Sequence, residues 1–480
     1  MNVRDLEPKV VWNHFSDLNA VPRPSKKEER VIKFMEDFGK KLNLDTYTDA
    51  AGNVIIRKPA TTGMEDRQTV ILQSHVDMVH QKNADTDFDF DTQGIEMYVD
   101  GDWVRAKGTT LGADNGMGVA AIMAVLSSTD IPHPAIEALF TVDEETGMTG
   151  AMELEKGILK GTILLNLDTE DDDEFSIGCA GGIDTNTKYV YDQVQIIEGS
   201  QTYNITVNGL NGGHSGVQIN EELGNANKIM NRLMYGCLEY NLQIVSINGG
   251  SLRNAIPRES FATIAVSPTY LEEFEKRVTF LKEEIAIQDP NLNIHIEATS
   301  QAGKAMSLAD TIQVTTALYA VHNGVFKYSR AIEGLVETSS SLARVIVNDG
   351  EFITQSLQRS SVESGKYDVA YTVAAPFHLM GCSVEHKGDY PGWAPNPTSA
   401  ILDVLVAKYK ELFNDEEPKV MAIHAGLECG LLGERIPGLD MISFGPTIKG
   451  AHSPDERCGI KSTAKFWMLL KEILVNVPGR

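Results

Sequence analysis

Apolar and polar positions along the first 185 residues predict helices and strands in alternation. The spacing of apolar residues predicts an amphipathic helix over Lys26 to Leu42 and a second, more apolar helix over Gly116 to Leu126. Short apolar runs at 68–74, 136–142 and 163–167 predict strands. Such alternation indicates a layered α/β domain.

The same signature returns near residue 393. Helices are predicted at 399–413 and 461–475, and strands at 420–424 and 441–444. The terminal parts of the chain therefore read as two pieces of one domain.

The middle of the chain has a different pattern. Strands with alternating polar partners, such as 203–207 and 261–266, are separated by amphipathic helices such as 271–285. A β-α-β-β-α-β order can be traced over 201–298, and a looser second set follows over 308–390. We therefore expect an inserted α+β domain at 187–392, with the second set as its duplicate. It would split an α/β domain into residues 1–186 and 393–480.

The net charge limits the kinds of partner that the protein can bind, and the N-terminal residues indicate where in the cell it is located. The net charge of −25 and the pI near 4.8 exclude nucleic acid and anionic membranes as partners, because an acidic surface repels both. No apolar signal core begins the sequence, and no apolar run is long enough to span a bilayer. We expect a cytoplasmic protein.

Five short segments, four of which follow apolar, strand-like runs or adjoin a predicted helix, carry imidazole and carboxylate groups. They are S-H-V-D at His75 and Asp77, G-A-D-N-G at Asp114, V-D-E-E-T-G at Glu144 and Glu145, L-D-T-E at Asp168, and G-A-H-S-P-D-E at His452. Divalent ions of zinc type take these ligands, and two neighbouring ions need about five such side chains when one carboxylate bridges them. The sequence predicts a two-metal hydrolase.

Individual roles follow from position. His75 and Asp77 lie two apart on a strand and face the same way, so one can bind metal while the other orients it. Asp114 precedes a helix and could be its N-cap, but the glycines around it allow a carboxylate to reach two ions. Glu144 and Glu145 leave a strand together, so one can be a ligand and the other a general base.

The segments Q-S-H-V-D-M-V, G-T-T-L-G-A-D-N-G, T-V-D-E-E-T-G-M-T-G-A, L-N-L-D-T-E, G-C-A-G-G, N-G-G-H-S-G and G-A-H-S-P-D-E occur in this order along nearly the whole chain. Together they resemble the co-catalytic metallopeptidases that include carboxypeptidase G, carnosinases and aminoacylases. The resemblance implies a mixed-sheet α/β di-metal peptidase domain with an inserted α+β lid.

The resemblance also assigns roles to the metal-site residues. His75 and Asp168 would hold one ion, Glu145 and His452 the other, and Asp114 would bridge them. Asp77 would orient His75. Glu144 would be the general base.

In the lid and the loops the resemblance implies substrate contacts. His214 of G-G-H-S-G would stabilise the oxyanion and Asn254 of R-N-A-I-P would contact substrate. Arg344 of S-S-S-L-A-R would bind the free carboxylate, for which a planar guanidinium is suited, and Glu428 of H-A-G-L-E-C-G would meet the free amino group.

The implied activity is hydrolysis of unblocked dipeptides, with a preference for a C-terminal histidine that rests on the resemblance alone. An aminoacylase, a deacylase or a tripeptidase would use the same metal constellation. A single-metal hydrolase is a further alternative, which a count of metal ions per chain would decide. A binding protein on this fold would be expected to lack a ligand or the base. We expect two divalent ions, zinc in first place with manganese and cobalt as alternatives, and a homodimer.

Overall fold

The computed structural model describes residues 2–300 and 303–480, which divide into two compact units. The first unit comprises Met1–Gly178, Pro395–Ala422 and Leu427–Arg480. The second comprises Cys179–Ala394 and the short segment Ile423–Gly426. The boundary lies before residue 187 because β9 (Gly181–Val190) is a strand of the second unit's sheet.

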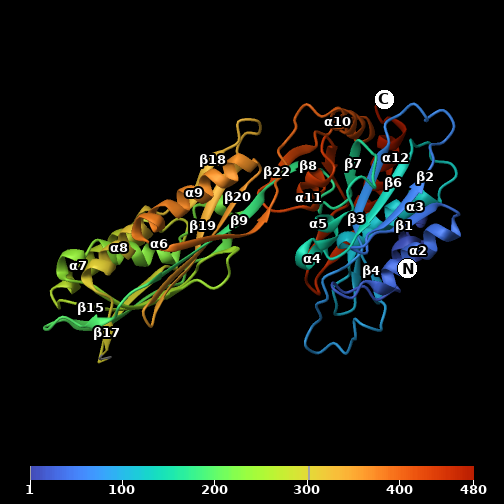
Figure 1. Ribbon diagram of the computed structural model, residues 1–480. Coiled ribbons are helices and arrows are strands. Elements are labelled where there is room, and N and C mark those ends of the chain that lie inside the picture. The colour runs from blue at the N-terminus through green and yellow to red at the C-terminus, as the bar shows by residue number, and fades with distance from the viewer. Residues whose placement is uncertain (1, 301–302) are drawn as a thin grey trace. The chain divides into compact units, whose positions relative to one another are not determined.

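The first unit is built on an eight-stranded mixed sheet (Figure 1). In spatial order its strands are β1 (Asp45–Thr48), β2 (Val54–Lys58), β6 (Ile136–Thr141), β3 (Val70–His75), β7 (Ile163–Asn166), β23 (Asp440–Ser443), β8 (Glu174–Cys179) and β22 (Lys419–Ile423). Strands β6, β3, β7 and β23 are mutually parallel, whereas β1, β2 and β8 pair antiparallel with their neighbours. The predicted mixed α/β fold is confirmed.

Helices accompany this sheet, and their sequences explain their burial. They are α1 (Lys9–Asn19), α2 (Glu29–Lys41), α3 (Ala113–Ser127), α4 (Glu144–Gly147), α5 (Thr149–Glu153), α10 (Ala400–Leu412), α11 (Glu428–Arg435) and α12 (Ile460–Val475). Helix α3 is apolar on every side and is buried over most of its length. Helix α2 begins three residues later than predicted, because Lys26 has a left-handed backbone (φ 71°) that no helix accommodates.

A smaller four-stranded sheet completes the first unit. Its order is β24 (Ile448–Lys449), β25 (Arg457–Gly459), β5 (Trp103–Ala106) and β4 (Met97–Asp100). It joins the C-terminal segment to a hairpin more than 340 positions earlier in the chain.

The second unit has a long sheet with helices along one side (Figure 1). The strand order is β16 (Asn293–Thr299), β11 (Gln201–Asn208), β15 (Ser260–Val266), β13 (Gln243–Gly249), β19 (Val336–Asn348), β20 (Glu351–Ser360), β9 and β21 (Ser383–Tyr390), with β18 (Gly324–Tyr328) paired to β19. The helices are α6 (Ala226–Tyr235), α7 (Tyr270–Glu284), α8 (Leu308–Ala320) and α9 (Glu363–Met380). The sheet and helices share one apolar core, which includes Ile229, Ile264 and Phe352.

Two short two-stranded sheets also belong to the second unit. Strand β10 (Val194–Gln195) pairs with β17 (Lys304–Ala305), and β12 (Gly213–His214) pairs with β14 (Ala255–Ile256). The order traced over 201–298 is present as β11, α6, β13, β15, α7 and β16. None of the described helices combines the length and apolarity needed to traverse a bilayer.

Candidate metal centre and active site

The parallel strands of the first unit place the candidate ligands at one edge of the sheet. His75 is the last residue of β3, Glu144 and Glu145 follow β6, and Asp168 follows β7. These strands are buried on both faces, as is typical of parallel strands, and the carboxyl ends of parallel strands are where α/β proteins bind ligands. Because the strands themselves are buried, these polar side chains lie together at the carboxyl ends of the strands.

Asp114 lies between two imidazoles. Its Oδ1 is 3.3 Å from Nε2 of His75, and its Oδ2 is 3.2 Å from Nε2 of His452. Its side chain makes no capping hydrogen bond to α3, whose first turn is non-helical at this residue. The alternative that Asp114 is only a helix N-cap therefore has no support in the structure.

Each imidazole faces a further carboxylate. Nε2 of His75 is 3.7 Å from Oδ1 of Asp168, and Nε2 of His452 is 3.0 Å from Oε2 of Glu145. Ligand atoms that share a tetrahedral zinc ion lie about 3.3 Å apart, given metal–ligand bonds of about 2.0–2.1 Å. Oε1 of Glu145 is buried and has no hydrogen-bond partner. The donor set and its spacing fit divalent ions.

Electrostatics also favour a cation here. Burial would lower the pKa of His75, but Asp168, Asp114 and Asp77 outweigh it and raise that pKa well above its usual value. Hydrogen bonds to Asp114 and Glu145 raise the pKa of His452 to about 11. The raised pKa values of both histidines show that the carboxylates around them concentrate negative charge at this position. A divalent ion requires such negative charge in its ligands.

Asp77 lies behind His75, on the side away from Asp114. Its Oδ1 is 3.2 Å from Nδ1 of His75 and accepts a hydrogen bond from the N–H of Glu144 (3.1 Å), while its Oδ2 accepts one from Ser25 (2.8 Å). A carboxylate in this position can fix the tautomer of a histidine that binds metal. Asp77 thereby also links β3 to the turn that carries Glu144.

Glu144 is half-buried, and burial, with Asp168 and Glu428 nearby, raises its pKa well above the usual value. Glu428 is itself buried at the start of α11, and burial raises its pKa to about 7. Oε2 of Glu428 accepts hydrogen bonds from Gln73 (2.6 Å) and Thr141 (2.7 Å), while Oε1 has no partner. Two carboxylates of high proton affinity thus stand beside the candidate metal centre.

The second unit holds the other predicted residues. His214 is in β12, and its Nδ1 accepts hydrogen bonds from the N–H groups of Gly216 (3.2 Å) and Val217 (3.0 Å). A neutral imidazole that accepts at Nδ1 carries its proton on Nε2. Asn254 is exposed in the adjoining loop, where its carbonyl accepts a hydrogen bond from Ser215 (2.9 Å).

Arg359 was not predicted from the sequence. It is 5% exposed, its Nη1 donates to the hydroxyl of Tyr390 (2.9 Å), and its Nη2 is 3.5 Å from Nε2 of His214. Among the described residues, no carboxylate oxygen lies within 4.0 Å of this guanidinium. Two donors that face each other cannot bond, so Nη2 of Arg359 and Nε2 of His214 do not satisfy each other's hydrogen-bonding capacity. Arg344 lies elsewhere on the sheet, in β19 opposite Gln355.

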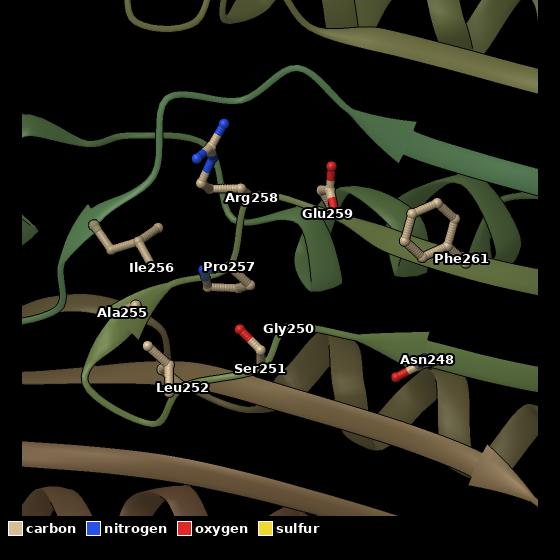
Figure 2. Close-up of a pocket in the computed structure, with 10 residues that line it drawn as sticks. All are labelled: Asn248, Gly250, Ser251, Leu252, Ala255, Ile256, Pro257, Arg258, Glu259 and Phe261. Carbon is tan, nitrogen blue, oxygen red and sulfur yellow. The ribbon is translucent and has the colours of Figure 1, made fainter. Parts of the chain in front are cut away.

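A separate hollow of about 410 Å³ lies in the second unit beside β14 (Figure 2). Figure 2 shows Arg258 and Glu259 on one side and Leu252 and Ser251 on the other. None of the predicted catalytic or metal-binding side chains lines it. The chemistry of the site, and not the size of a cavity, therefore locates the candidate centre.

The class of protein can now be stated. Residues 71–476 match peptidase family M20/M25/M40, and the chain belongs to this family. It is thus a hydrolase of peptide bonds, as predicted.

Relatives extend the likeness over the full chain. The chain is 41% identical over 480 residues to the cytosol non-specific dipeptidase of Escherichia coli, covering 99% of both. The crystal structure of the aminoacylhistidine dipeptidase from Vibrio alginolyticus superimposes with a TM-score of 0.96 at 42% identity, covering 100% of this chain and 99% of that one. An aminopeptidase from Bacillus cereus, at 16% identity and a TM-score of 0.57, covering 98% of this chain and 99% of that one, shares the fold.

Proposed function

We propose that the chain is a cytosolic dipeptidase that requires two divalent metal ions and cleaves dipeptides with free termini. The observation that carries the proposal is Asp114, whose two carboxylate oxygens each face a different imidazole, His75 and His452. Asp168 and Glu145 complete the two ligand sets. The names of the similar dipeptidases from Escherichia coli and Vibrio alginolyticus support the substrate class and, for the former, the compartment.

Bound ions would lower the pKa of a water molecule and polarise the scissile carbonyl. Glu144 takes a proton from the attacking water and passes it to the leaving amine, for which a carboxylate of raised pKa beside the reacting atoms is suited. Asp77 keeps His75 in one tautomer throughout. We assign zinc to the site, with manganese or cobalt as substitutes.

The second unit contributes substrate recognition in this proposal. The Nε2–H group of His214 donates a hydrogen bond to the developing oxyanion and keeps its proton; burial together with Arg359 lowers the pKa of the ring, so that it is neutral. Arg359 binds the free carboxylate through its buried guanidinium, which has no carboxylate partner among the described residues. Asn254 and Arg344 stay predicted substrate contacts, and a homodimer stays the predicted assembly.

Glu428 is proposed to receive the free amino group. Its buried Oε1 lacks a hydrogen-bond partner, and an ammonium would satisfy it. A buried acceptor for an ammonium group favours peptides with an unblocked N-terminus. The predicted preference for a C-terminal histidine in the substrate is not supported by any contact described above.

A substrate panel tests this function. Metal-loaded protein should hydrolyse free dipeptides and should act at least tenfold more slowly on the same dipeptides when they are N-acetylated, amidated at the C-terminus, or extended to tripeptides. Including dipeptides with and without a C-terminal histidine decides the preference, on which the names of the two relatives differ. Faster turnover of N-acetylated substrates would replace the dipeptidase with an aminoacylase.

A further inference from the structure

A buried carboxylate outside the ligand set binds the loop that carries Asp114. Glu456 is 2% exposed and accepts hydrogen bonds from four consecutive N–H groups. Its Oε2 accepts from Leu111 (2.7 Å) and Gly112 (2.9 Å), and its Oε1 accepts from Ala113 (2.7 Å) and Asp114 (3.2 Å). We propose that Glu456 is a positioning residue that sets the separation of Asp114 from His452 and thereby the affinity for metal. This inference rests on the proposed two-metal function.

His452 and Glu456 belong to one compact turn. Ser453 joins its two ends, because its hydroxyl donates to the carbonyl of Gly450 (2.7 Å) and its carbonyl accepts from the N–H of Glu456 (3.0 Å). His452 itself has a left-handed backbone (φ 62°), a conformation that costs a residue other than glycine about 1 kcal/mol or more. A carboxylate anchored in this turn therefore holds the imidazole and the Asp114 loop at a fixed distance.

Arg23 binds the same loop from the other side. Its Nη2 donates to the carbonyl of Gly112 (2.6 Å), and its Nη1 donates to the carbonyls of Val76 (3.1 Å) and Asp77 (3.0 Å). Gly112 has φ 69°, and a Cβ there would lie 2.5 Å from Nη2 of Arg23. The loop is thus fixed to the end of β3 by Arg23 and to the His452 turn by Glu456.

A carboxylate suits this role better than its amide. It offers about four acceptor sites and no donor, which matches four N–H groups. In Glu456→Gln the shape is kept, but one oxygen becomes an NH₂ group that cannot accept from Ala113 and Asp114, or from Leu111 and Gly112. The loop is then free to shift by the small distances that decide metal affinity.

The test compares metal binding by wild type and Glu456→Gln. Competition with a chromogenic chelator gives Kd for Zn²⁺, and the visible absorption of the Co²⁺-loaded protein reports ligand geometry without any need for turnover. We expect Kd to rise about 10- to 100-fold, the usual effect of removing a partner that orients metal ligands. The Co²⁺ bands should change in position or intensity.

Asp455→Asn is the matched control. Asp455 is the exposed neighbour of Glu456, so this variant removes one negative charge from the same turn and leaves the loop contacts intact. Its Kd and Co²⁺ spectrum should equal those of wild type. An equal loss in both variants would assign the effect to overall charge and overturn the inference.

A purely structural role predicts another result. Glu456→Gln would then melt at a lower temperature as the apoprotein but would keep the wild-type Kd and Co²⁺ spectrum below its melting point, which would overturn the inference. If Glu456→Gln does not fold, Glu456→Asp replaces it, because it keeps the charge but shortens the reach by one methylene. An unchanged Kd in that variant would contradict positioning equally. Wild type that binds no metal would instead refute the proposed function itself.

Discussion

Substitution of Glu144 by glutamine separates the general base from the metal ligands. Glu144 follows β6, its N–H donates to Asp77 (3.1 Å), and neither of its carboxylate oxygens is needed for the two ligand sets. Burial raises its pKa well above the usual value, so the group accepts a proton readily. The amide has the same shape and cannot accept that proton.

General acid–base catalysis contributes about 10²- to 10⁴-fold, so kcat should fall by at least 10². That fall corresponds to about 3–5 kcal/mol of transition-state stabilisation. Metal content should stay at the wild-type value, and KM should change by less than a factor of a few. Initial rates over a range of dipeptide concentrations, together with metal analysis of the same samples, measure all three quantities.

Two neighbouring glutamates serve as controls. Glu145→Gln makes the same chemical change at the adjacent position, but its Oε2 faces His452 at 3.0 Å, so this variant should lose metal. Glu153→Gln, on an exposed face of α5, should behave as wild type. Retention of kcat within tenfold in Glu144→Gln, or a loss confined to KM, would refute its role as the base.

Four further predictions follow from the same contacts. Asp114→Asn should lower metal content and activity together, because one carboxylate serves both imidazoles; two tightly bound ions per chain, counted by elemental analysis, would contradict a bridging role. Arg359→Ala should raise KM for a free dipeptide by at least tenfold and leave its C-terminal amide unaffected; equal effects on both substrates would exclude carboxylate binding. His214→Ala should lower kcat by about 10²- to 10³-fold with metal content unchanged; an unaltered kcat would remove His214 from the mechanism. Burial lowers the pKa of His424 to about 3, so only the unfolded state gains its proton as the pH falls below about 6.5. Denaturant titrations at pH 7.5 and 5 should show about 2 kcal/mol of stability lost through this residue, a loss absent in His424→Gln; identical pH dependence in both proteins would contradict a neutral buried ring.

The position of His75 and Asp168 at one sheet edge could be predicted, because each lies at the end of a strand whose apolar residues indicate burial. The runs V-I-L-Q-S before His75 and I-L-L-N-L before Asp168 are apolar enough to be buried on both faces, and their ends must lie at one sheet edge. Local pattern could not decide whether Asp114 caps a helix, since that depends on His452, which is 338 positions away.

Residues that act through distant backbone groups left no local signal. In the sequence, Glu456 is one of two acidic residues in an S-P-D-E segment that is typical of an exposed turn. The four N–H groups that it binds lie more than 340 positions earlier in the chain. Arg359 reads as a polar residue at the end of a strand, because nothing nearby in sequence indicates that its guanidinium is buried. Strand β9 was not predicted either, since its glycine-rich start, G-G-I-D-T, resembles a loop and becomes a strand only between β20 and β21.

Titration of metal into apoprotein, with dipeptide hydrolysis followed at each step, tests the central claim most directly. Two ions should bind per chain, and hydrolysis should be absent without them and reach its maximum as the second site fills. Undiminished hydrolysis by protein shown to contain no metal would contradict the account.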